Sequence, residues 1–215
     1  YPLRDYYKKC IASDAFGDVL NIIENYNVLS VGPGLSDTAA TNEFVDDLIK
    51  YLNKNNKKTV IDADAINVLS KSELSSFPSD SVITPHPVEL SRLINTPVKD
   101  IQNDRIKYAK LTAEKFGCCV VLKGNQTVVC TKELEVFVNT SGNSALAKAG
   151  SGDVLTGIIS GLMAQGVSVE NAAKLGVYLH GLCGELASQD LSLYSVLATD
   201  QIDYIPQAIK KILEA

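Results

Sequence analysis

Short runs of β-branched and apolar residues alternate with longer amphipathic patterns through the first two thirds of the chain. The runs Val28–Val31, Thr59–Ile61 and Ser81–Thr84 are typical of buried strands, whereas Thr38–Asn53 and Val98–Phe116 carry apolar residues at helical spacing. Because parallel strands must be joined by a crossover, this alternation predicts a mainly parallel central sheet with helices on both faces. The fold class is therefore α/β.

Three short runs that follow in quick succession predict an antiparallel meander at one edge of this sheet. They are Cys118–Leu122, Thr127–Thr131 and Glu135–Asn139. Cys118 and Cys119 are adjacent, so we expect their side chains on opposite faces of the sheet. The rest of the chain is predicted to be helical, over Ser151–Gln165, Val169–Gln189 and Thr199–Leu213.

Charge, hydropathy and cysteine usage exclude several classes of protein. The chain carries 20 Lys and Arg against 25 Asp and Glu, and its lysines are scattered, so we expect no nucleic-acid partner. No apolar stretch approaches the roughly 18 residues of a membrane span, and no signal-peptide pattern is found. The five cysteines contain no Cys-x-x-Cys motif and predict small buried side chains in a reducing compartment, hence a cytoplasmic protein.

A glycine-rich loop that opens directly into an amphipathic helix is the most informative segment. Gly150-Ser151-Gly152-Asp153 stands at the start of that helix, where unpaired N–H groups and the helix dipole favour a bound anion. A structural explanation is that Ser151 caps the helix and Asp153 complements its dipole. An acid beside a bound phosphate could instead remove a proton from an attacking hydroxyl group. The loop lacks the Gly-Lys-[Ser/Thr] of a Walker A motif.

Distinctive segments also follow the first three predicted strands. Gly32-Pro33-Gly34-Leu35 suits a tight turn or the close approach of a ligand. Asp62-Ala63-Asp64 places two carboxylates where they could bind a metal or a hydroxyl group, or cap the next helix. His86 lies between two prolines that stiffen its backbone, and Glu89 follows in the first turn of a helix. We expect His86 to be functional and the carboxyl-end loops of the sheet to form the ligand surface.

Two further features have both a structural and a functional interpretation. Lys123-Gly124-Asn125-Gln126-Thr127 suits an anionic nucleotide lying along the sheet edge, and it also suits a polar hairpin turn. His180 lies on an apolar helix and is interpreted as a core or interface residue. The apolar residues of the same helix would suit the interface of a homo-oligomer; they include Leu175, Val177, Leu179 and Leu182.

Taken in order, five of these segments resemble the ADP- or ATP-dependent NAD(P)H-hydrate dehydratases, a ribokinase-like family. The segments are Gly32-Pro-Gly-Leu35, Asp62-Ala-Asp-Ala-Ile-Asn67, Thr84-Pro-His-Pro-Val-Glu89, Leu122-Lys-Gly-Asn-Gln-Thr127 and Ala149-Gly-Ser-Gly-Asp-Val-Leu-Thr-Gly157. The resemblance implies a single ribokinase-like domain over residues 1–215. It also implies a metabolite-repair lyase that dehydrates the S form of hydrated NADH or NADPH (NADHX, NADPHX) while consuming the terminal phosphate of ADP or ATP. A functional partnership with NAD(P)H-hydrate epimerase, fused or separate, is implied as well.

The resemblance further assigns roles to individual residues. Asp153 would be the catalytic base and Glu89 would organise Mg²⁺. The anion hole would comprise Gly150, Ser151 and Gly152. The adenine nucleotide would contact Gly152 together with Lys123, Gly124, Asn125, Gln126 and Thr127. The hydrated nicotinamide dinucleotide would contact Gly34, His86 and Asp153.

Two departures from the family pattern are expected to matter. Lys148 stands before the glycine-rich loop where many relatives have threonine, which could alter how the loop meets phosphate or a cation. Such enzymes usually begin with a strand, a glycine-containing loop and a helix, and these are not found ahead of residues 14–27. We therefore expect this chain to lack an N-terminal strand–helix segment.

Two other functions share parts of the pattern. A ribokinase-like kinase acting on a vitamin precursor would use Asp153 and the same anion hole but would release a stable phosphorylated product. A non-catalytic nucleotide-binding subunit would keep the loop without turnover. The residues His86-Pro87 and Gly32-Pro33-Gly34 favour the dehydratase over the kinase.

Overall fold

A six-stranded sheet forms the centre of the computed structural model, which describes residues 5–6, 10–12 and 14–214. Its strands follow the order of the chain: β3 (Val28–Val31), β4 (Lys58–Ile61), β5 (Ser81–Ile83), β6 (Cys119–Leu122), β7 (Val128–Cys130) and β8 (Val136–Val138). The strands β3 to β6 pair in parallel, and β6, β7 and β8 pair antiparallel. The predicted parallel sheet with an antiparallel edge meander is confirmed. A separate two-stranded ribbon consists of β1 (Asp5–Tyr6) and β2 (Cys10–Ile11).

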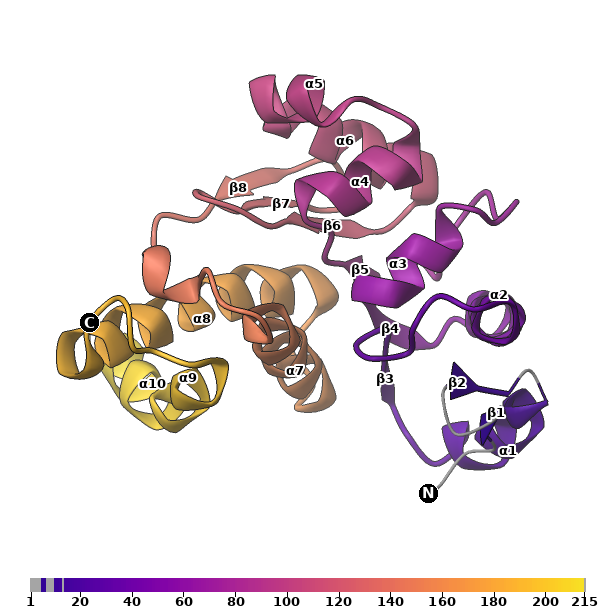
Figure 1. Ribbon diagram of the computed structural model, residues 1–215, viewed down its shortest axis with the longest axis horizontal. Helices are drawn as coiled ribbons and strands as arrows, with labels where there is room; N and C mark the ends of the chain where they lie inside the picture. Colours follow the sequence, from indigo (N-terminus) through magenta and orange to yellow (C-terminus); the bar gives the residue numbers. More distant parts are fainter. Residues whose placement is uncertain (1–4, 7–9, 13, 215) are drawn as a thin grey trace.

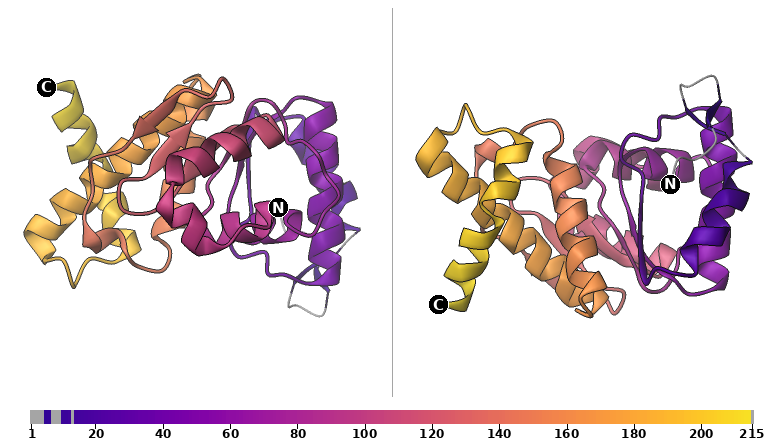
Figure 2. Two further views of the ribbon diagram at one scale, coloured as in Figure 1. Left: turned by 90° about the horizontal axis from the view of Figure 1, so that it is seen from above. Right: turned by 90° about the horizontal axis from the view of Figure 1, so that it is seen from below.

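Helices cover both faces of the sheet (Figure 1). The elements that share a hydrophobic core on one face are α1 (Ala15–Ile23), α2 (Ala39–Lys54), α3 (Ala63–Leu69), α4 (Pro87–Ile94), α5 (Val98–Asn103) and α6 (Arg105–Phe116). The other face packs against α7 (Ser151–Ala164) and α8 (Val169–Leu191). Beyond α8, on the side of the molecule away from α2, lie α9 (Ala198–Asp203) and α10 (Ile205–Leu213) (Figures 1 and 2).

Adjacent residues of each central strand belong to opposite cores. Val82 packs under α7 and α8, whereas Ile83 packs under the helices of the other face. Cys118 and Cys119 divide in the same way, as predicted. Both thiols are buried, and burial raises their pKa above that of an exposed thiol. They therefore act as small apolar side chains.

Two predicted helices are interrupted in the structure. The predicted helix 98–116 divides into α5 and α6 at Asp104, whose backbone is not helical and whose side chain accepts a hydrogen bond from the Lys107 N–H. Aspartate is a strong N-cap because its carboxylate satisfies an unpaired N–H of the next helix. The predicted helix 199–213 divides at Tyr204, because Pro206 in the first turn of α10 cannot continue the preceding helix.

The apolar residues of α8 do not form an open interface. Val177, Leu179 and Leu182 are buried within the chain, where Leu179 and Leu182 pack against Ala208 of α10. The prediction that these side chains supply a subunit interface is therefore wrong, because the helices α7 and α10 already cover them. A homo-oligomer would need another surface.

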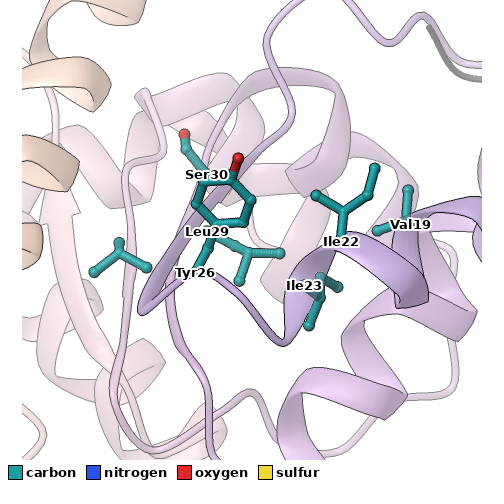
Figure 3. Close-up of a pocket in the computed structure, with 7 residues that line it drawn as sticks. Val19, Ile22, Ile23, Tyr26, Leu29 and Ser30 are labelled. Atoms are coloured by element: carbon teal, nitrogen blue, oxygen red, sulfur yellow. The ribbon is translucent and has the colours of Figure 1, made fainter. Parts of the chain in front are cut away.

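The strand β3 is one of the two edge strands of the sheet, and an apolar hollow of about 360 Å³ lies beside it. Figure 3 shows Val19, Ile22 and Ile23 of α1 facing Tyr26 and Leu29 around it. Tyr26, a large and mostly apolar side chain, is 53% exposed beside this hollow.

Among the described residues, no helix is both long and apolar enough to cross a lipid bilayer.

Gly32, directly after β3, is fixed by the close approach of two chain segments. Its φ is +134°, and a Cβ atom added there would lie 1.7 Å from the carbonyl oxygen of Asp62. Only glycine fits both the backbone conformation and the space. The loop after β3 and the turn after β4 are therefore in backbone contact.

We expect Gly32→Ala to lower the free energy of unfolding by about 3 kcal/mol or more, because it adds overpacking to a strained backbone. The matched control is Gly157→Ala in α7, where an added Cβ meets nothing within 4 Å. That variant should be neutral or more stable by about 0.5–1 kcal/mol. Urea denaturation of both variants measures the difference, and an equal effect of the two substitutions would contradict the close approach.

Candidate active site

The loops that follow β3, β4, β5 and β6 meet at the carboxyl edge of the sheet. Backbone hydrogen bonds continue the sheet into these loops, from the Asp62 N–H to the Val31 carbonyl (3.0 Å) and from the Lys123 N–H to the Pro85 carbonyl (2.9 Å). The start of α7 reaches the same edge from the other face, because Gly152 lies next to the Lys123 side chain. Four of the predicted segments and the glycine-rich loop are thus brought together.

Asp62 is the most deeply buried carboxylate of this edge, with an exposed fraction of 1%. Its Oδ1 accepts a hydrogen bond from Lys123 Nζ at 2.7 Å, and its Oδ2 accepts one from Thr156 Oγ1 of α7 at 2.8 Å. Asp62 occupies the N-cap position of α3, yet its side chain makes no capping hydrogen bond. The capping alternative is therefore wrong for Asp62, whose carboxylate instead joins β4, β6 and α7.

Lys123 lies at the centre of the site. Its ammonium group is 2.7 Å from Asp62 Oδ1 and 3.9 Å from Glu89 Oε2. It also lies 3.4 Å from the point that a Cβ atom would occupy at Gly152. A cation beside the first turn of a helix adds to the attraction that the helix dipole exerts on an anion. The position of Lys123 is thus suited to a phosphate group.

The first turn of α7 presents unpaired backbone donors. Gly150 precedes the helix with a φ of +85°, and the Ser151 N–H donates to the Lys148 carbonyl at 3.2 Å. The N–H groups of Gly152 and Asp153 have no acceptor within the described part of the chain, as expected for the start of a helix. The Asp153 side chain is exposed and, among the same residues, makes no hydrogen bond or ion pair. The first turn of α7 therefore combines two backbone donors for an anion with the free carboxylate of Asp153.

Ser151 anchors this turn to the C-terminal helices. Its buried Oγ donates to Gln201 Oε1 of α9 at 3.0 Å and lies 3.1 Å from His180 Nε2 of α8. His180 Nε2 is also 3.0 Å from Gln201 Oε1, so the three side chains form one buried network. The idea that Ser151 caps α7 is wrong, and the interpretation of His180 as a satisfied core residue is confirmed. Gln201 was not predicted, because nothing in its local sequence distinguishes it from other polar helix residues.

His86 has a capping role that the sequence analysis did not assign. Its Nδ1 accepts hydrogen bonds from the N–H groups of Val88 (3.1 Å) and Glu89 (3.2 Å) at the start of α4. Glu89 Oε2 accepts the His86 N–H at 2.7 Å, which completes a capping box. Since Nδ1 is an acceptor, a neutral imidazole carries its proton on Nε2, on a side chain that is 47% exposed. The ring is therefore fixed in place, with Nε2 3.4 Å from Glu89 Oε1 and about half of the side chain exposed.

Glu89 is the residue that the family resemblance assigns to Mg²⁺. Its carboxylate is nearly buried and faces His86 and Lys123. Among the described residues, no group of three or more His, Cys, Asp or Glu side chains could hold a metal by itself. Mg²⁺ commonly takes one or two protein carboxylates and completes its shell with water and substrate phosphates, so this donor set fits a cation that arrives with a nucleotide.

The loop of residues 32–36 is held by the second carboxylate of the Asp62-Ala63-Asp64 turn. Asp64 Oδ2 accepts the Ser36 N–H at 2.7 Å, and the Leu35 N–H donates to the Gly32 carbonyl at 3.3 Å. Gly34, the predicted substrate contact, is exposed at the tip of this loop with a φ of +73°. The loop is therefore a defined turn that faces the same edge as His86.

The predicted nucleotide segment forms a compact exposed turn after β6. Thr127 Oγ1 accepts the Gly124 N–H at 3.3 Å and donates to the Gly124 carbonyl at 3.0 Å, while Asn125 and Gln126 are exposed. The hairpin-turn alternative is thus correct in geometry and leaves two amide side chains free to contact a ligand. Lys148 donates to the Tyr194 carbonyl at 3.0 Å, so its ammonium group is engaged with the segment that follows α8.

We expect the stability of the protein to depend on pH through His180. Burial lowers the pKa of His180 to about 4. Between pH 6.5 and 4 the unfolded chain binds a proton that the folded state does not, so the free energy of unfolding falls as the pH falls, by about 3 kcal/mol in total. Urea denaturation at a series of pH values should show a smaller loss in His180→Gln than in the original chain. Equal losses in the two proteins would contradict the assignment.

Comparison with known proteins identifies relatives over nearly the whole chain. The family model described as NAD(P)H-hydrate dehydratase matches residues 2–207. A bifunctional NAD(P)H-hydrate repair enzyme Nnr of Moorella thermoacetica is 38% identical over 206 residues, which are 95% of this chain and 38% of the relative. The ADP-dependent (S)-NAD(P)H-hydrate dehydratase of Bacillus subtilis is 35% identical over 208 residues, which are 97% of this chain and 70% of the relative.

A solved structure has the same fold. The ADP/ATP-dependent NAD(P)H-hydrate dehydratase from Bacillus subtilis, co-crystallised with ATP and Mg²⁺, matches with a TM-score of 0.76 at 34% identity, over 86% of this chain and 64% of that chain. The chain therefore spans only part of the length of these relatives. Since the family model covers nearly all of its residues, the chain belongs to the NAD(P)H-hydrate dehydratase family.

Proposed function

We propose that this domain catalyses the nucleotide-dependent dehydration of (S)-NAD(P)H hydrate to NAD(P)H. The reaction would convert ADP to AMP, or ATP to ADP, and release phosphate. The observation that carries the proposal is the start of α7, where the unpaired N–H groups of Gly152 and Asp153 lie beside Lys123 and the free Asp153 carboxylate. Such an arrangement can bind a phosphoryl group and accept a proton from the hydroxyl that attacks it.

The phosphoryl-transfer half of the proposed reaction uses two features of this edge. Asp153 takes the proton of the substrate hydroxyl. At the same time the hydroxyl oxygen bonds to the terminal phosphorus of the nucleotide, and the bond from that phosphorus to the bridging oxygen breaks. Of the predicted anion hole Gly150–Gly152, the unpaired Gly152 N–H, together with the Asp153 N–H, would stabilise the charge that develops on the phosphoryl oxygens. Phosphate then leaves with the electron pair of the carbon–oxygen bond. Hydroxide is a much poorer leaving group than phosphate. The neighbouring carbon gives up a proton to water, which completes the elimination and restores the dihydropyridine ring.

The two substrates would lie on opposite sides of Asp153. We assign the nucleotide to Lys123, the turn Gly124–Thr127 and Gly152, and the hydrated dinucleotide to Gly34 and His86. Glu89 would hold a Mg²⁺ that arrives with the nucleotide, and this cation would neutralise phosphate charge. The exposed amides of Asn125 and Gln126 and the exposed His86 ring support these assignments.

Several properties of the whole protein remain predictions. The bifunctional repair enzymes among the relatives support a partnership with the epimerase activity. A cytoplasmic location and a homo-oligomer stay predictions, and a homo-oligomer would not use the buried apolar face of α8.

We expect Asp153→Asn to bind nucleotide within about threefold of the original affinity and to lose at least about a hundredfold in turnover. Asparagine has nearly the shape of aspartate, but its amide cannot act as the catalytic base. Recovery of the near-ultraviolet absorbance of NADH from its hydrate, with ADP or with ATP, measures turnover, and calorimetry measures binding. Near-normal dehydration by the variant would rule out Asp153 as the base. Accumulation of a phosphorylated alcohol in place of NADH would favour the vitamin-precursor kinase.

A further inference from the structure

We propose that Asp62 and Asp64 are positioning residues that serve opposite halves of the site. Asp62 fixes Lys123 on the nucleotide side, whereas Asp64 fixes the loop of residues 32–36 on the dinucleotide side. The inference rests on the proposed function and deepens it, because it assigns each substrate its own supporting carboxylate. Neither residue needs to touch a substrate.

Asp62 can position Lys123 because the ion pair is buried and doubly supported. The Lys123 side chain is 19% exposed and that of Asp62 1% exposed, and Nζ lies 2.7 Å from Oδ1. Thr156 donates to the other carboxylate oxygen at 2.8 Å, which favours the orientation in which Asp62 faces Lys123. A lysine side chain otherwise has many rotamers, and confining it in advance reduces the entropy that binding a phosphate would cost.

Asp64 can position the substrate loop because that loop has an unfavourable backbone. Ser36 adopts a φ of +60°, which residues with a Cβ atom visit rarely. Such conformations persist when the surrounding structure holds them, and the 2.7 Å hydrogen bond from the Ser36 N–H to Asp64 Oδ2 ties this residue to the turn after β4. Gly34 lies two residues away in the same turn.

The local backbone explains why the two carboxylates diverge. In a continuous strand, side chains at positions i and i+2 point to the same face. Ala63 between them has a φ of +49°, whereas Asp62 before it is extended and Asp64 after it is helical. The left-handed residue turns the chain, so Asp62 faces Lys123 and Asp64 faces Ser36. One short turn thus reaches both halves of the site.

The test compares the effect of each substitution on the two substrates. Asp62→Asn should raise the KM and calorimetric Kd for nucleotide by about tenfold or more, while the KM for the hydrate changes less than about threefold. Asp64→Ala should do the reverse, because alanine removes the acceptor of the Ser36 N–H. The matched control is Asp80→Asn, which breaks an ion pair with Lys132 just before β5, at the opposite edge of the sheet, and should change neither KM.

Thr156→Val provides a second variant for the nucleotide side, because it removes one hydrogen bond to Asp62 without changing a charge. It should raise the nucleotide Kd in the same direction by a smaller factor, with the hydrate KM unchanged. Equal effects of Asp62→Asn and Asp64→Ala on both substrates, or an unchanged nucleotide Kd in Thr156→Val, would overturn the inference. Nucleotide binding by the original chain without dehydration would refute the proposed function alone, since the Kd comparison still tests Asp62.

Discussion

The buried ion pair between Asp62 and Lys123 is the interaction on which the arrangement of the site depends. Removing two charges from water is costly, and the cost is recovered only when the partners are close and their remaining hydrogen-bonding capacity is used. Here the distance is 2.7 Å, and Thr156 uses the second carboxylate oxygen. Asp62 follows β4, Lys123 follows β6, and Thr156 lies in the helix α7, which packs on one face of the sheet. The pair therefore fixes the sheet edge and α7 relative to each other.

The helix α7 is held at this edge from two sides. Thr156 binds Asp62 towards the sheet, and Ser151 binds His180 and Gln201 towards the C-terminal helices. An anion site built from backbone N–H groups is effective only when those groups already point at the ligand, because reorganisation during the reaction would cost part of the gain. Two buried networks, one turn apart, provide that rigidity while the Asp153 carboxylate stays exposed.

The strands, the edge meander and the start of α7 could be predicted because each leaves a local pattern. Buried parallel strands are short continuous apolar runs, and a glycine-rich loop before an amphipathic segment marks a helix start. The helix predicted over 98–116 was wrong at Asp104, because apolar spacing continues across a cap that only the backbone geometry reveals. The α8 interface was wrong for a related reason: an apolar helix face does not say whether it is covered by the same chain or by another.

The sequence by itself determined the fold class, the family and the segments from which the site is built. Only the tertiary structure decided which side chains meet. Asp62 pairs with Lys123, 61 residues away, and with Thr156, 94 residues away, while Ser151 finds Gln201 at a separation of 50. Local patterns encode the conformation and burial of each segment. The partner of a polar side chain depends instead on strand order and helix packing, which bring together segments that are distant in the chain.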